Sequence, residues 1–234
     1  MDVTATMEVN ERSPRVTARL AGIFYLLNIV TIFLSIFFFR GLFVSGDATS
    51  TASNIEAHRL LFQAGFALEL VSTGCSLGVA AFLYYLLSPV NKSLSLFAAF
   101  CRVVACGMFV VNDLFQLASS HLAGAESQPL GQMLSAFRAD SSSIGIVFFA
   151  FHFVLIGYLI FSSNFLPRLL GVLLIFAGFG ALTFLVPSFG RSIFLYFAPL
   201  GLIAEVSLTV WLLAKGVNAQ TWHERAEAAV SLGI

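Results

Sequence analysis

The chain has 234 residues, of which 59% are hydrophobic and only 10% are charged, and 26 of them are phenylalanine. A soluble domain carries about a quarter charged residues, so this composition excludes an ordinary soluble protein and predicts an integral membrane protein. The formal net charge is zero at pH 7, which provides no overall basic field and argues against a nucleic-acid partner.

Apolar runs long enough to cross a bilayer, which takes about 20 helical residues, occur six times along the chain. The first lacks the small-residue cleavage pattern of a signal peptide and is expected to be retained. We therefore predict an all-α polytopic membrane protein with six transmembrane helices in one bundle at residues 18–39, 60–87, 94–117, 144–161, 169–186 and 193–214. The transmembrane domain would cover residues 17–217, between an N-terminal segment at 1–16 and a C-terminal tail at 218–234.

Three features outside these runs are also predicted. Ser53 and Glu56 have the spacing of a capping box, so the second helix should begin before the membrane, with its first turns above it. The loop at 123–142 should contain a short helix lying in the membrane interface. Its apolar face would carry Leu130, Met133, Leu134 and Phe137. The tail after Lys215 is interpreted as a solvated helical extension.

The distribution of lysine and arginine predicts the orientation. An even number of spans places both termini on one side of the membrane. That side would collect Arg12, Arg15, Arg19, Lys92, Arg168, Lys215 and Arg225, against Arg40, Arg59, Arg138 and Arg191 on the other. Because basic residues are concentrated in cytoplasmic loops, we expect both termini to be cytoplasmic.

Ionisable side chains inside the spans are the candidate functional residues. Arg102 and Asp113 share one helix face, but they are eleven residues apart, which separates them by roughly 16 Å along the helix axis. An unpaired charge at the centre of a span costs about 2.5 to 3.5 kcal/mol, so each needs a partner on another helix. We predict a polar seam that contains Asn28, Glu69, Arg102, Asp113, His152 and Glu205.

Depth in the membrane suggests the pairs within this seam. Arg102 and Glu205 lie at similar levels and are expected to form an ion pair. Asp113 is nearest in depth to Glu69, and since two carboxylates at one level repel, one of them should hold a proton or share a cation. His152 lies near the middle and would complete either cluster. A purely structural role for these residues, as hydrogen bonds between helices, remains the alternative.

The motifs leave three classes of function open. The seam would surround a proton, an ion or a small solute in a carrier or conductor. Alternatively, the protein would be a non-catalytic structural or sensory subunit, in which the seam only holds the helices of the bundle together. Such a subunit would assemble with its partners through small residues of the fifth helix. Those residues are Gly171, Ala177, Gly178 and Ala181. The third class is an enzyme acting on a lipid-like substrate within the membrane, for which no catalytic motif is present. The sequence provides no spacing typical of a metal or haem site, so no cofactor is predicted.

Several short stretches resemble a known family of bacterial membrane proteins, the domain-of-unknown-function family 4386. They are "ARLAG", "GDATSTASNI", "LLSPVN", "FCRVV", "GYLIFSSNFLPRLLGVLL" and "AEVSLTVWLLAKGV". The resemblance extends over residues 18–217 and implies a multi-pass protein of the bacterial cytoplasmic membrane, without implying an activity. It maps recurring polar positions of the family onto Arg19, Asp47, Asn54, Asn91, Arg102, Pro167, Arg168 and Glu205. Glu69 and Asp113 are less clearly part of that pattern.

Overall fold

The computed structural model describes residues 13–44, 47–121 and 128–231, and the regular structure within them is helical. The helices are α1 (Pro14–Phe39), α2 (Ala48–Ala57), α3 (Arg59–Leu87), α4 (Lys92–Ser119), α5 (Gln128–Ser163), α6 (Arg168–Leu182), the short 3-10 helix η2 (Thr183–Leu185), α7 (Pro187–Ala214) and α8 (Ala219–Ser231). Over these residues, six segments are long and apolar enough to cross a membrane, namely α1, α3, α4, α5, α6 with η2, and α7. The predicted all-α bundle of six membrane helices is confirmed.

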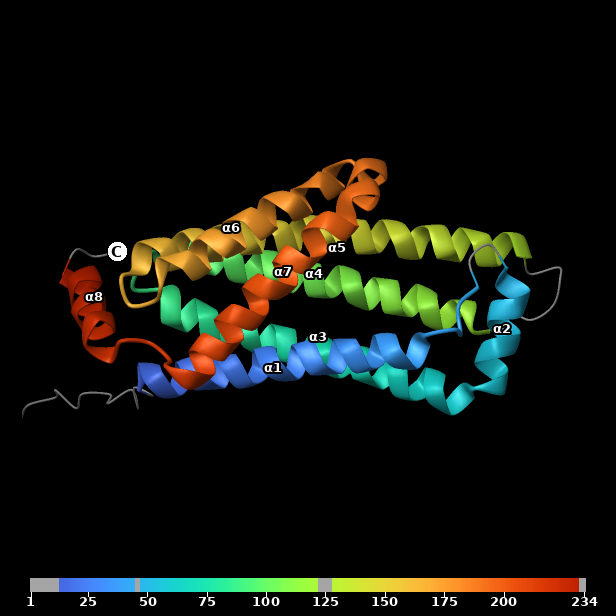
Figure 1. Ribbon diagram of the computed structural model, residues 1–234, viewed down its shortest axis with the longest axis horizontal. Coiled ribbons are helices and arrows are strands. Elements are labelled where there is room, and N and C mark those ends of the chain that lie inside the picture. The colour runs from blue at the N-terminus through green and yellow to red at the C-terminus, as the bar shows by residue number, and fades with distance from the viewer. Residues whose placement is uncertain (1–12, 45–46, 122–127, 232–234) are drawn as a thin grey trace, which may run out of the picture.

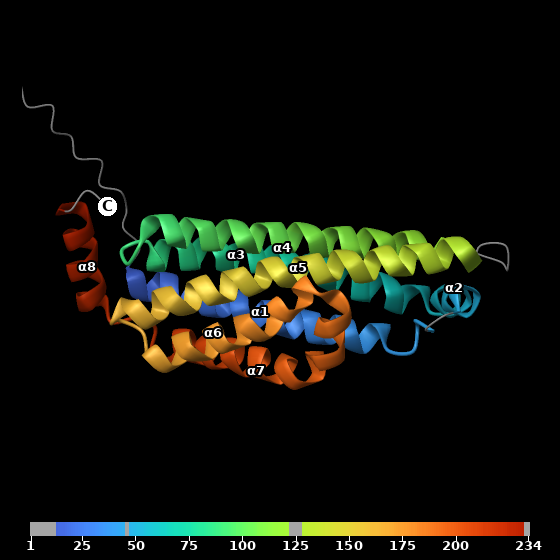
Figure 2. The same cartoon turned by 90° about the horizontal axis from the view of Figure 1, so that it is seen from above.

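The six spanning helices form a closed ring (Figure 1). Each packs against the next in the order α1, α3, α4, α5, α6, α7 and back to α1. The start of α1 and the whole of α8 lie at one end of this ring, which we call the α8 end. Helix α2 lies across the opposite end, which we call the α2 end (Figures 1 and 2).

Local sequence determines where these helices begin and end. Proline occupies the first position of α1 and of α7, where its missing N–H is not needed. The Asn91 side chain caps α4 by accepting a hydrogen bond from the Leu94 N–H at 2.9 Å. Beyond α7, Gly216 adopts a φ of +67° and donates its N–H to the Trp211 carbonyl at 3.0 Å, which ends the helix.

Helices α5 and α6 approach each other closely at two glycines. A Cβ added to Gly157 would lie 2.6 Å from the Gly171 carbonyl oxygen, and one added to Gly171 would lie 2.5 Å from the Gly157 carbonyl oxygen. Ala177 and Gly178 are also buried in α6, where a Cβ on Gly178 would meet α5. Of the four small residues for which an oligomer contact was predicted, Gly171, Ala177 and Gly178 pack inside the chain, while Ala181 is half-buried. The oligomer contact itself stays a prediction.

The α8 end holds a dense apolar core to which the tail contributes. Trp222 of α8 is only 5% exposed, donates its indole N–H to the Leu86 carbonyl at 2.9 Å and stacks on Tyr85 with ring centroids 5.6 Å apart. The tail is helical, but it is not the freely solvated extension that its polar composition suggested. The buried Trp222 side chain, together with a hydrogen bond of 2.9 Å from Nη2 of Arg225 to the Ser162 carbonyl, holds it against the end of the bundle.

At the α2 end, the segment before the second span differs from the prediction. It forms a separate helix, α2, which ends at Ala57 before α3 begins at Arg59. Its N-cap is Asp47, whose carboxylate accepts the Ser50 N–H at 2.9 Å. The predicted cap at Ser53 is wrong, because this residue lies inside α2.

The predicted interfacial helix is also absent from the described part of its loop. Helix α5 is continuous over 36 residues, so Leu130, Met133 and Phe137 lie on its first turns. Residues 122–127 lie outside the described part of the chain. A contact with α4 supports this extension, since the Asn112 side chain donates to the Arg138 carbonyl at 2.9 Å.

The α6–α7 hairpin is shorter than its neighbours. Helix α6 has 15 residues against 36 in α5, and the turn that joins it to α7 lies part-way along α5 in both views (Figures 1 and 2). Near the α2 end, α5 therefore extends beyond its α6 and α7 neighbours. The cavities described below lie in this half of the molecule.

Candidate functional site: a polar cavity inside the ring

Arg102 of α4 is fully buried, and its contacts reach three other helices of the ring. Its Nε donates to the Ser76 hydroxyl of α3 at 2.9 Å. Its Nη1 lies 3.0 Å from the Tyr25 hydroxyl of α1 and 3.1 Å from Nε2 of His152 on α5. The guanidinium thus links α1, α3, α4 and α5 through neutral groups.

Aromatic rings also surround this guanidinium. Its central carbon lies 4.9 Å from the centroid of the Tyr25 ring and 4.9 Å from that of Phe149. The negative faces of these rings attract the cation where water is excluded. Together with the three hydrogen bonds, they explain how a full positive charge is tolerated at this depth.

His152 is held as a neutral hydrogen-bond acceptor. Its Nδ1 lies 2.9 Å from the Ala98 carbonyl oxygen, to which it can only donate. Its Nε2 faces Arg102, which has donors only. These two partners assign the ring proton to Nδ1. His152 therefore positions Arg102, with both ring nitrogens occupied.

The predicted ion pair between Arg102 and Glu205 is not formed. No nitrogen–oxygen pair of the two lies within 4.0 Å, and the ion pair that the described residues contain joins Arg191 to Asp140. Instead, Nη2 of Arg102 and Oε1 of Glu205 are each buried without a hydrogen-bond partner. The two side chains still interact electrostatically. The other nitrogens of Arg102 are directed to nearer neutral acceptors, which depth alone did not reveal.

A cavity of about 450 Å³ lies beside this cluster. Five of the six ring helices contribute to its wall, and most of the contributing side chains are polar. The lining residues are Asn28, Ile32 and Ile36 of α1; Glu69, Ser72, Thr73 and Ser76 of α3; Cys106, Phe109, Asn112 and Asp113 of α4; Ser142 and Phe149 of α5; and Phe194 and Glu205 of α7.

Three carboxyl groups face this cavity. Those of Glu69 and Asp113 are close enough to interact electrostatically with each other, and the Arg138 guanidinium is close enough to act on both. The Gln116 amide donates to Oε2 of Glu69 at 3.3 Å. Glu205 supplies the third group, from α7. The structure thus brings Glu69 and Asp113 together from α3 and α4, as their depth suggested.

Asn28 fixes one side of the cavity wall. Its side-chain amide donates to the Ser72 hydroxyl at 2.8 Å and to the Ser72 carbonyl at 2.9 Å, which ties α1 to α3. The Ser72 hydroxyl in turn lies 3.3 Å from the Asn28 carbonyl. Of the six residues predicted for the seam, Asn28, Glu69, Asp113 and Glu205 line the cavity, while Arg102 and His152 lie behind its wall.

A second hollow of about 490 Å³ adjoins the first near the end of α1. Glu69 and Ile36 line both hollows, so the two share part of their wall. The second also carries Arg40 and Arg138 among phenylalanines of α1. Glu69 therefore stands between an inner acidic space and an outer space with basic side chains.

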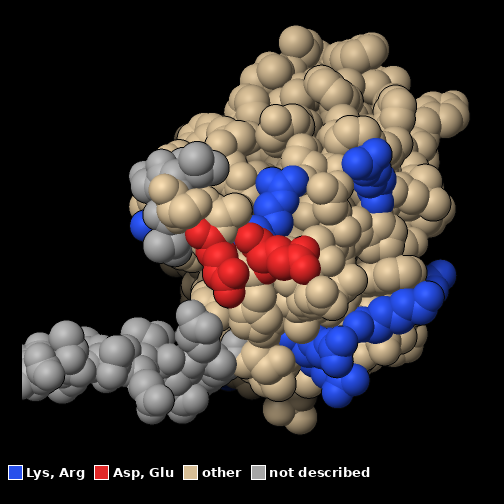
Figure 3. All heavy atoms as spheres, turned by 90° about the vertical axis from the view of Figure 1, so that its left-hand side faces the viewer, with Lys and Arg blue, Asp and Glu red and all other residues tan. Residues whose placement is uncertain are grey.

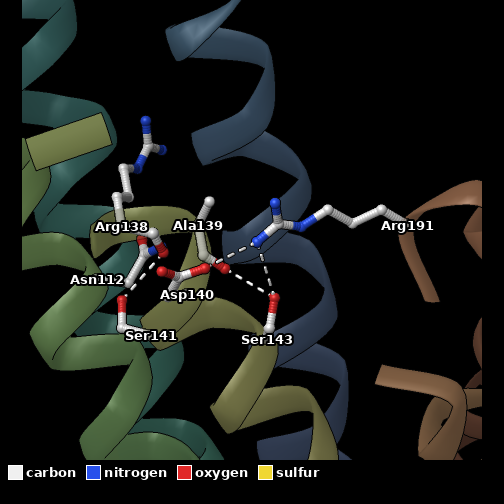
Figure 4. A network of polar contacts seen from close by, with 7 residues as sticks. All are labelled: Asn112, Arg138, Ala139, Asp140, Ser141, Ser143 and Arg191. Atoms are coloured by element: carbon white, nitrogen blue, oxygen red, sulfur yellow. Dashed lines mark hydrogen bonds and ion pairs between the residues drawn. The ribbon is translucent and has the colours of Figure 1, made fainter. Parts of the chain in front are cut away.

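A polar bridge connects α7 to α5 next to the cavity wall (Figure 4). Nη2 of Arg191 lies 3.2 Å from Oδ1 of Asp140 and 3.3 Å from the Ser143 hydroxyl. Arg191 precedes Phe194 of the wall by one helical turn, and Asp140 and Ser143 flank Ser142. The bridge connects the first half of α7 to α5 at the level of the cavity.

Tyr25, Phe149 and Arg138 belong to the site but were not predicted. Tyr25 lies three residues before Asn28, and Phe149 lies three residues before His152. Residues at that spacing share a helix face, so the pattern contained a signal for both. Arg138 was assigned to an interfacial loop, and only the continuity of α5 places it beside the carboxyl groups.

Comparisons with known proteins found one relative and one family. A protein of Archaeoglobus fulgidus described as "Uncharacterized protein" is 28% identical over 141 residues, which cover 59% of this chain and 75% of that protein. No solved structure matches the chain. Residues 20–216 match the family described as "Domain of unknown function (DUF4386)". The chain therefore belongs to the DUF4386 family, as its motifs indicated.

Proposed function

We propose that this protein handles a positively charged solute in the bacterial cytoplasmic membrane and binds it in the cavity inside the ring. The observation that carries the proposal is the wall of that cavity. Glu69, Asp113 and Glu205 reach it from three different helices, and its lining contains no lysine or arginine among the described residues. Ionisable residues inside a membrane bundle are costly and generally mark a path for an ion, a proton or a solute.

The charges around the cavity support a cation of low valence. Three carboxyl groups line it, and the guanidinium groups of Arg102 and Arg138 act on them from behind the wall. With all five groups ionised, the formal charge is −1, which one positive charge would neutralise. Carboxylates that served only to hold the helices together would be expected to have basic partners in direct contact.

The charges at the two ends of the bundle support the orientation. The α8 end carries Arg15, Arg19, Lys92, Arg168, Lys215 and Arg225. Basic side chains are spread over this end face, while the acidic ones gather in one place (Figure 3). By the positive-inside rule, the α8 end would face the cytoplasm. The second hollow, near the α2 end, would then lie on the outer side and could admit the solute.

The orientation is tested by labelling single cysteines in intact cells. In a variant whose three native cysteines are replaced, Ser53→Cys on α2 should react with an impermeant maleimide, whereas Ala219→Cys on α8 should react only after the cells are opened. Reaction of Ala219→Cys in intact cells would reverse the proposed orientation.

Charge-selective labelling of the cavity tests the function. Thr73→Cys places a thiol on the cavity wall, and a positively charged methanethiosulfonate should modify it at least about tenfold faster than a negatively charged one of similar size. Ser53→Cys on the exposed face of α2 is the control and should show a much smaller preference. Adding Glu69→Gln and Asp113→Asn should remove the preference at Thr73→Cys. Equal rates in the parent, or a faster anionic reagent, would refute the proposal.

A further inference from the structure

We infer that the solute is a small organic ammonium ion that donates at least one N–H and carries an apolar group. This inference rests on the proposed function and specifies the chemical class of its ligand. Three properties of the cavity support it: its size, the phenyl rings in its wall and the unpartnered carboxyl oxygen of Glu205.

The size of the cavity fits an organic molecule better than a metal ion. Pockets for small organic ligands range from about 300 to 1,000 Å³, and this one measures about 450 Å³. A metal ion needs several oxygen or nitrogen ligands converging within about 2 to 2.6 Å of one point. Among the residues that the structure describes, no three histidine, cysteine, aspartate or glutamate side chains are grouped in that way.

The wall combines carboxylates with aromatic rings. Phe109 of α4, Phe149 of α5 and Phe194 of α7 line the cavity together with the three acids. Phe149 already lies against the Arg102 guanidinium. Phe109 packs against Phe149 and Phe194 against Phe184, both edge-on with ring centroids 6.4 and 5.8 Å apart, but neither Phe109 nor Phe194 lies against a cation among the described residues, so these two rings are assigned to the ligand. Phenyl faces attract ammonium groups, and they also pack against apolar carbon. An inorganic cation would use only the carboxylates.

Glu205 indicates which kind of ammonium group would bind. Its Oε1 is inaccessible to solvent and has no hydrogen-bond partner in the described structure, although the side chain lines the cavity. A buried acceptor without a donor destabilises the state that contains it, and a ligand N–H would satisfy it once the carboxyl group turns this oxygen toward the cavity. A quaternary ammonium has no N–H to offer. The expected ligands are therefore primary, secondary or tertiary amines in their protonated form.

Binding of matched small molecules to the purified protein in lipid nanodiscs tests the inference. Benzylamine at neutral pH supplies the proposed cation. Benzyltrimethylammonium keeps the charge without an N–H, benzyl alcohol keeps the ring without the charge, benzoate reverses the charge, and potassium is the inorganic control. Isothermal titration should show benzylamine binding at least about tenfold more tightly than each of the others. Equal binding of benzyl alcohol would overturn the inference.

Variants of the wall identify the place of binding. Phe194→Leu and Glu205→Gln should each weaken benzylamine binding by about tenfold, a fold-change typical of losing one cation–π contact or one charged hydrogen bond. Phe176→Leu and Glu224→Gln are the matched controls, on the exposed surfaces of α6 and α8, and should change it less than twofold. Thermal unfolding without ligand must show that all four variants are folded. If Phe194→Leu does not fold, Phe194→Ile takes its place. An unchanged affinity in both wall variants would overturn the inference.

The outcomes separate the inference from the function on which it rests. If Thr73→Cys shows its preference for the cationic reagent and potassium binds more tightly than benzylamine, the solute is inorganic and only the inference falls. If the cationic preference is absent and no cation binds, the proposed function falls with it. Benzyltrimethylammonium binding as tightly as benzylamine would refute the role assigned to Oε1 of Glu205.

Discussion

Replacing Arg102 with methionine should destabilise the protein far more than replacing Glu205 with leucine. Methionine has a similar length and no charge, so Arg102→Met removes the guanidinium without opening a large hole. The structure gives Arg102 three hydrogen bonds to neutral side chains and no contact ion pair. Glu205 has a buried carboxyl oxygen that is already without a partner.

The expected loss of unfolding free energy follows from the groups that each variant leaves without a hydrogen-bond partner. Polar contacts between membrane helices contribute on average about 0.6 kcal/mol each, and hydrogen bonds to a buried charge about 1.5 to 3 kcal/mol. Arg102→Met leaves the hydroxyl of Tyr25, the hydroxyl of Ser76 and Nε2 of His152 without this donor. We expect a loss of about 2 to 5 kcal/mol in the free energy of unfolding. Glu205→Leu should cost about 1 kcal/mol or less, since it breaks no contact ion pair.

The assay is unfolding in mixed micelles with an increasing fraction of sodium dodecyl sulfate. Arg168→Met on the exposed surface of α6 serves as the control and should change stability by no more than about 0.5 kcal/mol. A double-mutant cycle should show stronger coupling of Arg102 with Tyr25, measured through Tyr25→Phe, than with Glu205. A buried contact ion pair would cost about 3 to 5 kcal/mol on breaking either side. Equal destabilisation by Glu205→Leu and Arg102→Met would therefore refute our reading of the geometry.

Four further variants test the packing of the ring and its ends. Gly171→Val should lower stability by about 2 to 4 kcal/mol, because its Cβ would lie 2.5 Å from a carbonyl oxygen of α5. Gly74→Ala has no atom within 4 Å of the new methyl group and should be neutral or stabilise by up to about 1 kcal/mol, and thermal unfolding should rank the two in this order. Trp222→Phe keeps an aromatic ring but loses the indole N–H, so it should cost about 1 kcal/mol and speed hydrogen exchange in α8; unchanged exchange would show that α8 is held by other contacts. Arg191→Ala breaks an exposed pair with Asp140, whose side chains are 48% and 66% accessible, and should cost less than about 1 kcal/mol, a difference that about 1 M salt removes.

The fold was predictable because membrane crossing depends on local composition. A run of about 20 apolar residues is recognised as a candidate spanning helix from its own composition. Five of the six predicted runs lie within observed spans, and the run at 169–186 ends one residue beyond its span. Helix continuity at the α2 end depends instead on tertiary contacts. The first turns of α5 are polar enough to resemble a loop. A hydrogen bond from the Asn112 side chain to the Arg138 carbonyl ties them to α4, and hydrophobic periodicity cannot predict such a contact.

The members of the site were easier to predict than their pairing. Depth along a helix can be counted from the sequence, and it brought Glu69 and Asp113 to one level, where α3 and α4 are neighbours in the ring. Depth contains no information about direction around the ring. Arg102 and Glu205 share a level, yet the guanidinium is directed to α1, α3 and α5. Tyr25 was not predicted, because a tyrosine within an apolar run counts as a hydrophobic residue and its hydroxyl group is then disregarded.

The absence of a contact pair between Arg102 and Glu205 is itself consistent with a binding role. A guanidinium held by a carboxylate would neutralise that carboxylate and withdraw it from the cavity. Here hydroxyl groups, an imidazole and two aromatic rings hold the guanidinium, so its position does not depend on any of the three acids. Arg102 still interacts electrostatically with Glu205, the acid nearest to it in depth. Stability and the proposed cation preference would therefore depend on different side chains, and the variants above measure them separately.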